Sequence, residues 1–213
     1  MKHYPVIFVS GIDTDAGKTY ATAWLVQHLA AQGVRTITQK FIQTGCEGCS
    51  EDIEAHRRLC GIGLLPEDLD GTTAPIIFTY PASAQLAARI DGREIDLTLA
   101  DAATARLRSL YDCVLVEGAG GLMVPVTDDF MAIDYVATRR LPVVLVTNGR
   151  LGSINHTVLS LEAIAARGIE LAAVVYNHYF DADPVIAADT RAFIGRYTAR
   201  HFPSASVLDL PAL

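Results

Sequence analysis

The fold of this chain is decided by the stretch Ser10-Gly11-Ile12-Asp13-Thr14-Asp15-Ala16-Gly17-Lys18-Thr19. It follows the apolar run 6–9, which is typical of a buried strand, and it precedes a helical pattern. A strand, a glycine-bearing loop and a helix in this order are typical of a phosphate-binding loop. In such a loop, backbone amides converge on an anion, a lysine supplies positive charge and a hydroxyl can hold Mg²⁺. The stretch therefore predicts nucleotide binding, with Lys18 as the cation and Thr19 as the hydroxyl.

The spacing inside this loop departs from the strict motif. That motif has four residues between its first glycine and Gly-Lys-Thr, whereas five residues lie between Gly11 and Gly17. Taken alone, the residues indicate a variant phosphate-binding loop, with a chance match as the alternative.

Composition narrows the class of protein. A chain of 213 residues that is 51% apolar suits one α/β domain spanning residues 1–213. The net charge of −7 argues against nucleic-acid binding, which needs Lys and Arg to neutralise phosphates, and favours a small ligand. No uninterrupted apolar run approaches the ~18–20 residues of a membrane helix, so we expect no membrane partner and a soluble, cytoplasmic protein.

The cysteines Cys46, Cys49, Cys60 and Cys113 are too sparse for a secreted disulfide framework, and we expect reduced thiols. Cys46 and Cys49, with two residues between them, could coordinate a zinc ion together with His56 and Cys60. Because Cys60 also fits a small buried hydrophobe on a helix, we favour the interpretation without zinc. Whether Cys46 and Cys49 form a disulfide stays open.

The rest of the chain alternates apolar runs with helical patterns. We expect strands at about 6–9, 35–40, 111–116, 141–146, 171–176 and 207–210. We expect helices from the phosphate-binding loop to Gly33, from Ser50 as N-cap, at 83–90, at 97–110 after an Asp96 cap, at 131–139, from Ser153 to Gly168 and at 183–197. Segment 41–50 is expected to be a loop. Strand–helix–strand units close as right-handed parallel crossovers, which predicts an α/β fold of the P-loop NTPase type: a mostly parallel central sheet flanked by helices on both faces.

An acidic residue follows one of these strands, in Glu117-Gly118-Ala119-Gly120-Gly121. In open α/β sheets, ligands bind beyond the carboxyl ends of the strands, so Glu117 is well placed to meet a nucleotide's Mg²⁺. A tight turn that ends in an incidental acid is the alternative.

Three further positions carry candidate roles. Gly152-Ser153 opens a helix and is a potential anion site, with ordinary capping by Ser153 as the alternative. Asn177 can present both an amide donor and a carbonyl acceptor, which suits an adenine edge. Asp52 fits a dipole-matching acid in a helix's first turn, and its functional role depends on what faces it.

Taken together, these motifs resemble the dethiobiotin synthetases, the ATP-dependent carboxylase–cyclases of biotin synthesis. The resemblance runs from Val6 to about His178. Members of this family typically have five residues between the first glycine and Gly-Lys-Thr of the phosphate-binding loop, as this chain does. Its carriers are residues 11–19, Lys40 with Thr44-Gly45, Val116-Glu117-Gly118-Ala119-Gly120-Gly121, and Leu151-Gly152-Ser153-Ile154-Asn155-His156.

The resemblance implies roles for individual residues. The nucleotide would contact Asp15, Ala16, Gly17, Lys18, Thr19, Tyr20, Asp52, Glu117, Gly118, Ala119, Gly120, Asn177 and His178. The metal ligands would be Thr19, Asp52 and Glu117. The catalytic lysines would be Lys40, beside the reacting carbamate and γ-phosphate, and Lys18, at the β- and γ-phosphates. The substrate would contact Thr14, Lys40, Thr44 and, across a homodimer interface, Leu151, Gly152, Ser153 and Asn155.

The implied reaction uses ATP, with Mg²⁺ as cofactor, to join CO₂ to 7,8-diaminononanoate as a carbamate. The carbamate attacks the γ-phosphate, and the second amine then closes the ring to give dethiobiotin, ADP and phosphate. Phe41 stands where the family usually has proline, which bears on the path of the loop that carries Thr44. Segment 204–211 matches the family's base-framing segment only loosely, so the nucleotide preference stays open.

Two alternatives share this style of loop. Cobyrinic-acid-type amide ligases carry an extra glutaminase domain, for which a chain of this length has no room. Partition-type ATPase switches usually carry a lysine near the start of the loop, where this chain has Ser10, Gly11 and Ile12.

Overall fold

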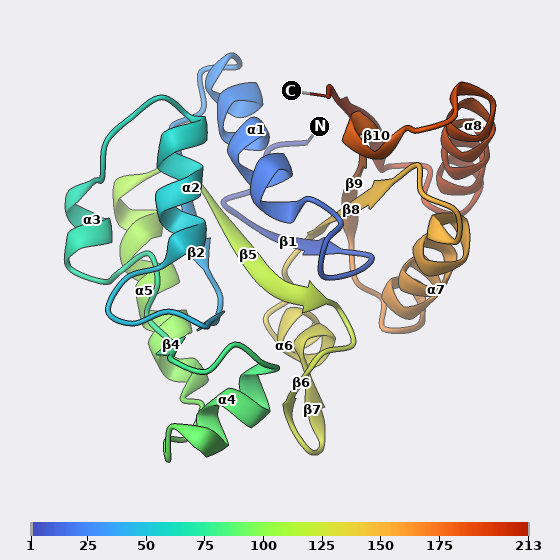
Figure 1. The fold of residues 1–213 in the computed structure, drawn as a ribbon. Coiled ribbons are helices and arrows are strands. Elements are labelled where there is room, and N and C mark those ends of the chain that lie inside the picture. The colour runs from blue at the N-terminus through green and yellow to red at the C-terminus, as the bar shows by residue number, and fades with distance from the viewer. Residues whose placement is uncertain (1, 213) are drawn as a thin grey trace.

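The computed structural model describes residues 2–212 and is built around a parallel sheet (Figure 1). In those residues six strands form this sheet in the order β10-β9-β8-β1-β5-β2, and every neighbouring pair is parallel. The strands are β1 (Val6–Gly11), β2 (Thr36–Lys40), β5 (Cys113–Gly121), β8 (Val143–Asn148), β9 (Leu171–Asn177) and β10 (Ser206–Leu210). All their carboxyl ends therefore meet at one edge of the sheet.

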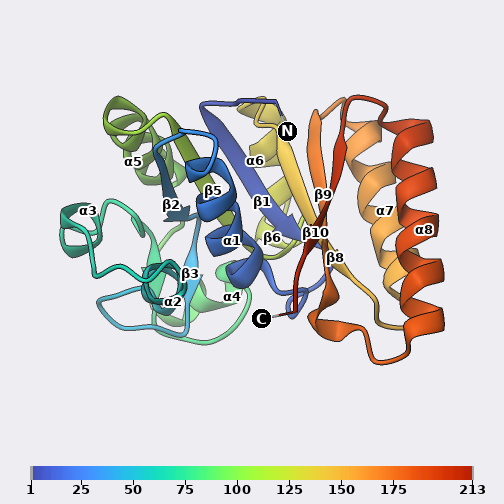
Figure 2. The same cartoon turned by 90° about the horizontal axis from the view of Figure 1, so that it is seen from above.

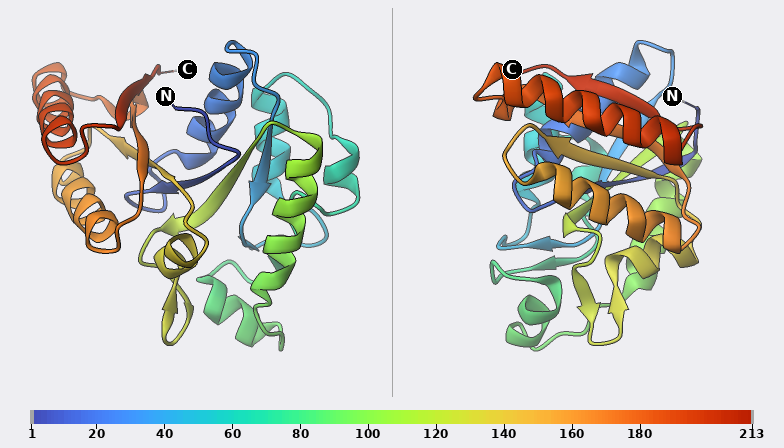
Figure 3. Two further views of the ribbon diagram at one scale, coloured as in Figure 1. Left: turned by 180° about the vertical axis from the view of Figure 1, so that it is seen from behind. Right: turned by 90° about the vertical axis from the view of Figure 1, so that its right-hand side faces the viewer.

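Helices cover both faces of the sheet. They are α1 (Lys18–Ala30), α2 (Glu51–Leu59), α3 (Pro66–Leu69), α4 (Ala84–Ile90), α5 (Leu97–Leu110), α6 (Ala132–Thr138), α7 (Ser153–Ala166) and α8 (Pro184–His201). Seen from above, α1 and α2 lie on one side of the sheet and α5 and α6 on the other (Figure 2). The helices α7 and α8 lie side by side at the β8–β10 end (Figure 3). The predicted α/β class is confirmed.

Strand β1 shows why both faces are apolar. Its side chains alternate, so that Ile7 and Val9 join the cluster under α1, whereas Val6 and Phe8 join the larger cluster under α5, α6 and α7. A strand buried on both faces needs a continuous apolar run, which is the pattern that the sequence presents.

Local signals set several helix ends as expected. The Ser50 hydroxyl accepts a hydrogen bond from the Ile53 amide at the start of α2, and the Asp96 carboxylate accepts one from the Thr98 amide at the start of α5. Beyond α1, Gly33 has φ +80°, a conformation that favours glycine. Helix α8 continues past the predicted end at Tyr197 to His201.

The strand before Glu117 is longer than predicted. Instead of turning after Val116, β5 continues to Gly121, which pairs with Gly11 of β1 beyond a register shift. The glycines make this possible, because a Cβ on Gly118 would lie 2.9 Å from Cζ of Phe8. Glycine has low strand propensity, and the run therefore resembled a turn in the sequence.

Four short strands escaped sequence analysis. The strands β3 (Gln43–Thr44) and β4 (Ile77–Phe78) pair in parallel, while β6 (Pro125–Thr127) and β7 (Phe130–Met131) form the hairpin that projects below α6 in Figure 1. Strands of two or three residues are too short for a hydrophobic period to appear. Segment 41–50, predicted as a loop, contains β3.

Phe41, at the position where proline was expected, is built into the core. Its ring packs edge-on to Phe8, with centroids 5.6 Å apart, and lies 4.5 Å from the ring of Tyr135. Its backbone N–H donates to the carbonyl oxygen of Glu117 at 2.8 Å. Proline has no such donor, so this residue extends the pairing of β2 with β5 beyond Lys40.

The structure separates the four candidate zinc ligands. His56 bonds to Thr38 and Glu117, and the Cys60 thiol lies 3.6 Å from the carbonyl oxygen of Ala23. All four cysteines are free thiols, Cys46 and Cys49 included, and no cluster of three or more His, Cys, Asp or Glu within residues 2–212 has a metal-binding arrangement. None of the described helices is both long and apolar enough to cross a bilayer.

Candidate active site

A cavity of about 920 Å³ opens at the carboxyl edge of the sheet. The ends of β2, β5, β9 and β10 contribute to its wall. The predicted site residues that line it are Thr14, Asp15, Gly17, Lys18, Thr19, Tyr20, Lys40, Thr44, Asp52, Glu117, Ala119, Gly120 and Asn177. Residues from five separate stretches of the sequence thus meet around one space.

The phosphate-binding loop wraps around the start of α1. The Lys18 ammonium donates to the carbonyl oxygens of Asp13 and Thr14 at 3.0 and 2.9 Å, which holds the amine inside the loop. Burial lowers the pKa of Lys18, and the charge of Lys40 acts in the same direction, against the attraction of Glu117. Gly17 has φ +89°, and a Cβ there would lie 2.2 Å from Nδ2 of Asn177.

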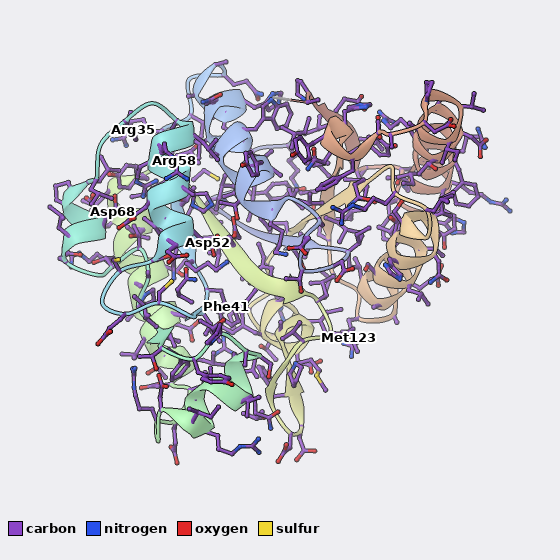
Figure 4. All side chains as sticks on the ribbon, in the orientation of Figure 1. Arg35, Phe41, Asp52, Arg58, Asp68 and Met123 are labelled. Atoms are coloured by element: carbon purple, nitrogen blue, oxygen red, sulfur yellow. The ribbon has the colours of Figure 1, made fainter. Side chains whose placement is uncertain are left out.

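Beside this loop, a hydroxyl and two carboxylates converge. Oγ1 of Thr19 lies 2.9 Å from Oδ1 of Asp52 and 3.4 Å from Oε1 of Glu117. Thr19 comes from the first turn of α1, Asp52 from the first turn of α2 (Figure 4) and Glu117 from β5. Asp52 therefore faces other polar groups of the site, which was the condition for a functional role.

Lys40 neutralises this acidic centre. Its Nζ lies 2.5 Å from Oδ2 of Asp52, 2.9 Å from Oε1 of Glu117 and 3.3 Å from the carbonyl oxygen of Gly118. Lys40 and Glu117 are register partners across β2 and β5, so the sheet itself sets them side by side.

Lys40 and Glu117 shift each other's pKa in the direction that keeps both side chains charged. Burial would raise the pKa of Glu117, but Lys40 and His56 hold it far below its ordinary value. Burial would lower the pKa of Lys40, but Glu117 and Asp52 raise it overall. At neutral pH the site therefore holds a carboxylate and an ammonium ion rather than a neutral pair.

The donor set fits Mg²⁺. This ion prefers oxygen ligands, takes one or two carboxylates from the protein and completes its octahedron with waters and substrate phosphates. The Thr19 hydroxyl and the carboxylates of Asp52 and Glu117 supply such a set beside the phosphate-binding loop. A third acid is not required.

A chain of contacts that was not predicted from the sequence lies behind Glu117. Nε2 of His56 lies 2.8 Å from Oε2 of Glu117, and Nδ1 of His56 lies 3.1 Å from Oγ1 of Thr38. Arg57 donates to Thr38 at 2.9 Å and forms a buried ion pair with Asp68. The available signal was the spacing of Asp52 and His56, which places them on one helix face, one turn apart.

In the cavity wall beside Gly17, the side chain of Asn177 is held in place. Its Nδ2 donates to the carbonyl oxygen of Ala16 at 3.3 Å, and its Oδ1 accepts from the Tyr179 amide at 3.1 Å. Arg150, with Cζ 3.8 Å from the ring centroid of Phe180, also lines the cavity, as do Phe180 and Tyr179. These three wall residues had not been predicted.

A second unpredicted wall lies near Thr44. Its residues are Ile42, Gln43, Pro81, Ala82, Ser83 and Ala84, and Val124 joins the cavity wall beside Gly120. The pairing of β3 with β4 draws residues 81–84 toward Thr44, which only the tertiary structure reveals.

The family can now be assigned from comparison with known proteins. A family model described as an AAA domain matches residues 6–207. The ATP-dependent dethiobiotin synthetase BioD of Chlorobaculum tepidum is 55% identical over 206 residues, which cover 96% of this chain and 86% of that protein. The ATP-dependent dethiobiotin synthetase BioD 2 of Pasteurella multocida is 46% identical, with 96% and 97% covered. The chain belongs to the dethiobiotin synthetase family. This confirms the predicted family and its class, an ATP-dependent cyclo-ligase.

Solved structures support the fold of this family member. A ParA family ATPase from Chlorobium tepidum superposes with a TM-score of 0.53 at 13% identity, covering 99% of this chain and 86% of that one. The signal recognition particle receptor FtsY of Elizabethkingia anophelis, in complex with GDP, gives 0.54 at 15% identity, with 97% and 56% covered. At such identities the likeness concerns the fold alone, so it does not favour the switch alternative.

Some residues implied by the dethiobiotin synthetase resemblance lie outside the cavity lining. They are Ala16, Gly118, His178, Leu151, Gly152, Ser153 and Asn155. His178, in the 3-10 turn η1 (His178–Phe180), bonds to Asp181 and Asp209 at 2.7 and 3.0 Å instead. Ser153 donates its hydroxyl to the carbonyl oxygens of Asn148 and Arg150.

Proposed function

We propose that this chain is a cytoplasmic, homodimeric enzyme that closes 7,8-diaminononanoate with CO₂ to dethiobiotin, using ATP and Mg²⁺, with ADP and phosphate as products. It would act as a single P-loop domain over residues 1–213. The observation that carries the proposal is the meeting of Lys18, Lys40, Asp52 and Glu117 around one cavity. The chain's membership of the dethiobiotin synthetase family agrees with it.

The phosphate end would be formed by residues 15–20. Backbone amides at the start of α1 and the Lys18 ammonium would bind the β- and γ-phosphates, as helix N-termini with a neighbouring lysine do in P-loop proteins. When bound, Mg²⁺ would offset phosphate charge from the ligands Thr19, Asp52 and Glu117. Lys40 forms ion pairs with both Asp52 and Glu117.

Lys40 would act at the reacting centre, where the carbamate meets the γ-phosphate. Lys40 pairs with Asp52 and lines the same cavity as Thr44, so the carbamate and the γ-phosphate would meet within its reach. Its positive charge would stabilise negative charge as the carbamate oxygen approaches phosphorus. Thr14 and Thr44 would orient the diamine and its carbamate.

The chemistry proceeds by three bond exchanges. One amine adds to CO₂ and loses a proton, giving a carbamate. A carbamate oxygen then attacks the γ-phosphorus while the bond to ADP breaks, giving a carbamic–phosphoric anhydride. The second amine attacks the carbamoyl carbon, and phosphate leaves as the ring closes. These steps require positioning and charge neutralisation rather than a nucleophilic side chain.

The base and the substrate carboxylate would occupy opposite ends of the cavity. We place the base near Asn177, Tyr179 and Phe180, which form the polar and aromatic wall beyond the phosphate-binding loop. The carboxylate would reach the 151–155 segment of a second copy of the chain. Leu151, the first residue of this segment, is 83% exposed, so its side chain is accessible to a second copy.

The test is to incubate the purified protein with the diamine, bicarbonate, Mg²⁺ and ATP and to detect dethiobiotin by mass spectrometry. We expect dethiobiotin and phosphate in equal amounts. Phosphate release that does not depend on the diamine would instead support a nucleotide switch.

A further inference from the structure

The two carboxylate oxygens of Glu117 face different partners. Oε1 lies on the side of the cavity, within 2.9 Å of Nζ of Lys40 and 3.4 Å of Oγ1 of Thr19. Oε2 lies 2.8 Å from Nε2 of His56, on the side of α2. Both Glu117 and His56 are fully buried, at 0% exposure. The carboxylate is therefore held at Oε2 and presents Oε1 to a ligand in the cavity.

The contacts behind His56 fix which of its nitrogens donates. Glu117 is paired with the Lys40 ammonium at 2.9 Å, and a carboxylate accepts only, so Nε2 of His56 donates to it. The Thr38 hydroxyl accepts a hydrogen bond from Arg57 at 2.9 Å and can donate its own hydrogen to Nδ1 of His56. Arg57 is in turn held by two bonds of 2.8 Å to Asp68. With the Nε2–H tautomer of His56, the donors run in one direction, from Arg57 through Thr38 and His56 to Glu117.

We infer that His56 is a positioning residue that makes Glu117 a ligand through one oxygen and thereby makes the metal site select Mg²⁺ over Ca²⁺. This inference rests on the metal site of the proposed function. Ca²⁺ takes six to eight oxygens and commonly uses both oxygens of a carboxylate, whereas Mg²⁺ takes six at shorter distances. With Oε2 hydrogen-bonded to His56, Glu117 presents Oε1 to the ion, and coordination through both oxygens would compete with this hydrogen bond.

The position of His56 on α2 strengthens the case. Asp52, the other carboxylate of the site, lies one turn earlier on the same helix, so α2 carries both a metal ligand and the residue that restrains the other ligand. His56 uses both ring nitrogens in contacts with Thr38 and Glu117, so its removal would take away the donor to Oε2 of Glu117. Partners of this kind typically change metal affinity by about 10–100-fold when they are removed.

The test measures metal binding, not turnover. Mn²⁺ binding to the full chain with ADP is followed by electron paramagnetic resonance, and Mg²⁺ and Ca²⁺ are titrated as competitors. We expect the preference for Mg²⁺ over Ca²⁺ to fall at least about tenfold in His56→Leu. It should return in part in His56→Gln, whose amide can still donate to Glu117. His28→Leu is the matched control, because His28 stacks on Trp24 of α1, away from the site, and it should bind like the wild type.

The outcomes separate the two proposals. An unchanged Mg²⁺ preference in folded His56→Leu overturns the role of His56 and leaves the metal site standing. A wild-type protein that binds no divalent ion with ADP overturns both. Should His56→Leu fail to fold, Thr38→Val takes its place, since it removes only the hydroxyl that orients the ring. A normal preference in that folded variant would likewise contradict the inference.

Discussion

The ammonium nitrogen of Lys40 lies 2.9 Å from Oε1 of Glu117, and the two residues are register partners on adjacent strands. Lys40 is 4% exposed and Glu117 0%, so neither charge has much water to stabilise it. Each charge depends on the other, and the pair joins the energetics of the fold to the chemistry of the site.

Replacing Lys40 with methionine should therefore affect both properties. We expect kcat to fall about 10²–10³-fold, because a charge that stabilises the transition state is lost. The variant should also be about 3–5 kcal/mol less stable in EDTA, because two acids lose their counter-ion, and Mg²⁺ should restore part of this stability. Steady-state kinetics and denaturant unfolding with and without Mg²⁺ measure both effects. Lys2→Met, which removes an exposed pair with Glu170, is the control; wild-type turnover in the Lys40 variant would contradict the assignment.

The left-handed conformation of Gly17 leads to a second prediction. Gly17→Ala should weaken ATP binding at least about tenfold, because alanine at φ +89° costs about 1–2 kcal/mol and its Cβ would meet Nδ2 of Asn177 at 2.2 Å. Isothermal titration calorimetry measures the affinity. Gly33→Ala is the matched control: its φ of +80° is similar, but nothing lies within 4 Å of the added Cβ. It should lose stability and keep ATP affinity, and equal effects on ATP binding in both variants would refute the argument.

Phe180 provides a test of the base end. Phe180→Leu should raise the KM for ATP about tenfold with little change in kcat, since stacking of a base on an aromatic ring is worth about 1–3 kcal/mol. The KM for GTP and for CTP should rise by a similar factor, because every base has a face that can stack on an aromatic ring. Phe193→Leu, on α8 against Tyr197, is the control. An unaltered KM for all three nucleotides would remove Phe180 from the base site.

The buried pair of Arg57 and Asp68 predicts how stability depends on pH. Burial would raise the pKa of Asp68, but bonds from Arg57, Leu65 and Thr73 lower it overall. An acid whose pKa is depressed on folding stabilises the fold above its ordinary pKa of about 3.9, and this contribution is lost as pH falls below that value.

Asp68→Asn should thus be about 3 kcal/mol less stable at pH 7, with a flatter decline from about pH 5 to pH 2 than the wild type. Urea unfolding at a series of pH values measures this difference. Asp112→Asn removes an exposed pair with Arg35 and should have a much smaller effect. Parallel pH curves for wild type and Asp68→Asn would show that the pair does not titrate as argued.

Leu151 tests the proposed homodimer. Leu151→Glu should shift the protein toward monomer in analytical ultracentrifugation and raise the KM for the diamine at least about tenfold, with ATP affinity unchanged. Leu69→Glu, at an equally exposed leucine of α3, should change neither property. A monomeric wild type with full activity would exclude a contribution from a second copy.

Much of the site was accessible from sequence because its residues lie next to local signals. Lys18 and Thr19 follow a glycine loop, Glu117 follows an apolar run, and Asp52 follows a helix cap. Their convergence was inferred from the family resemblance, and the contacts among them come from the structure.

The rest depends on contacts between distant segments. The contact between His56 and Glu117 joins α2 to β5, and no sequence pattern near either residue predicts this contact. The wall at residues 81–84 depends on the two-residue strands β3 and β4, which are too short to leave a pattern. The extension of β5 through glycines depends on the ring of Phe8, so local propensity indicated a turn there.

The backbone bond from Phe41 to Glu117 offers a reporter of motion at the reacting centre. Deuterium uptake at that one amide would record how often the segment beside Lys40 separates from its neighbour, with and without nucleotide or diamine. A proline at this position, which the resemblance led us to expect, would have no amide hydrogen to exchange. The amide of Phe41 thus gives this chain a reporter of opening and closing at the reacting centre during turnover.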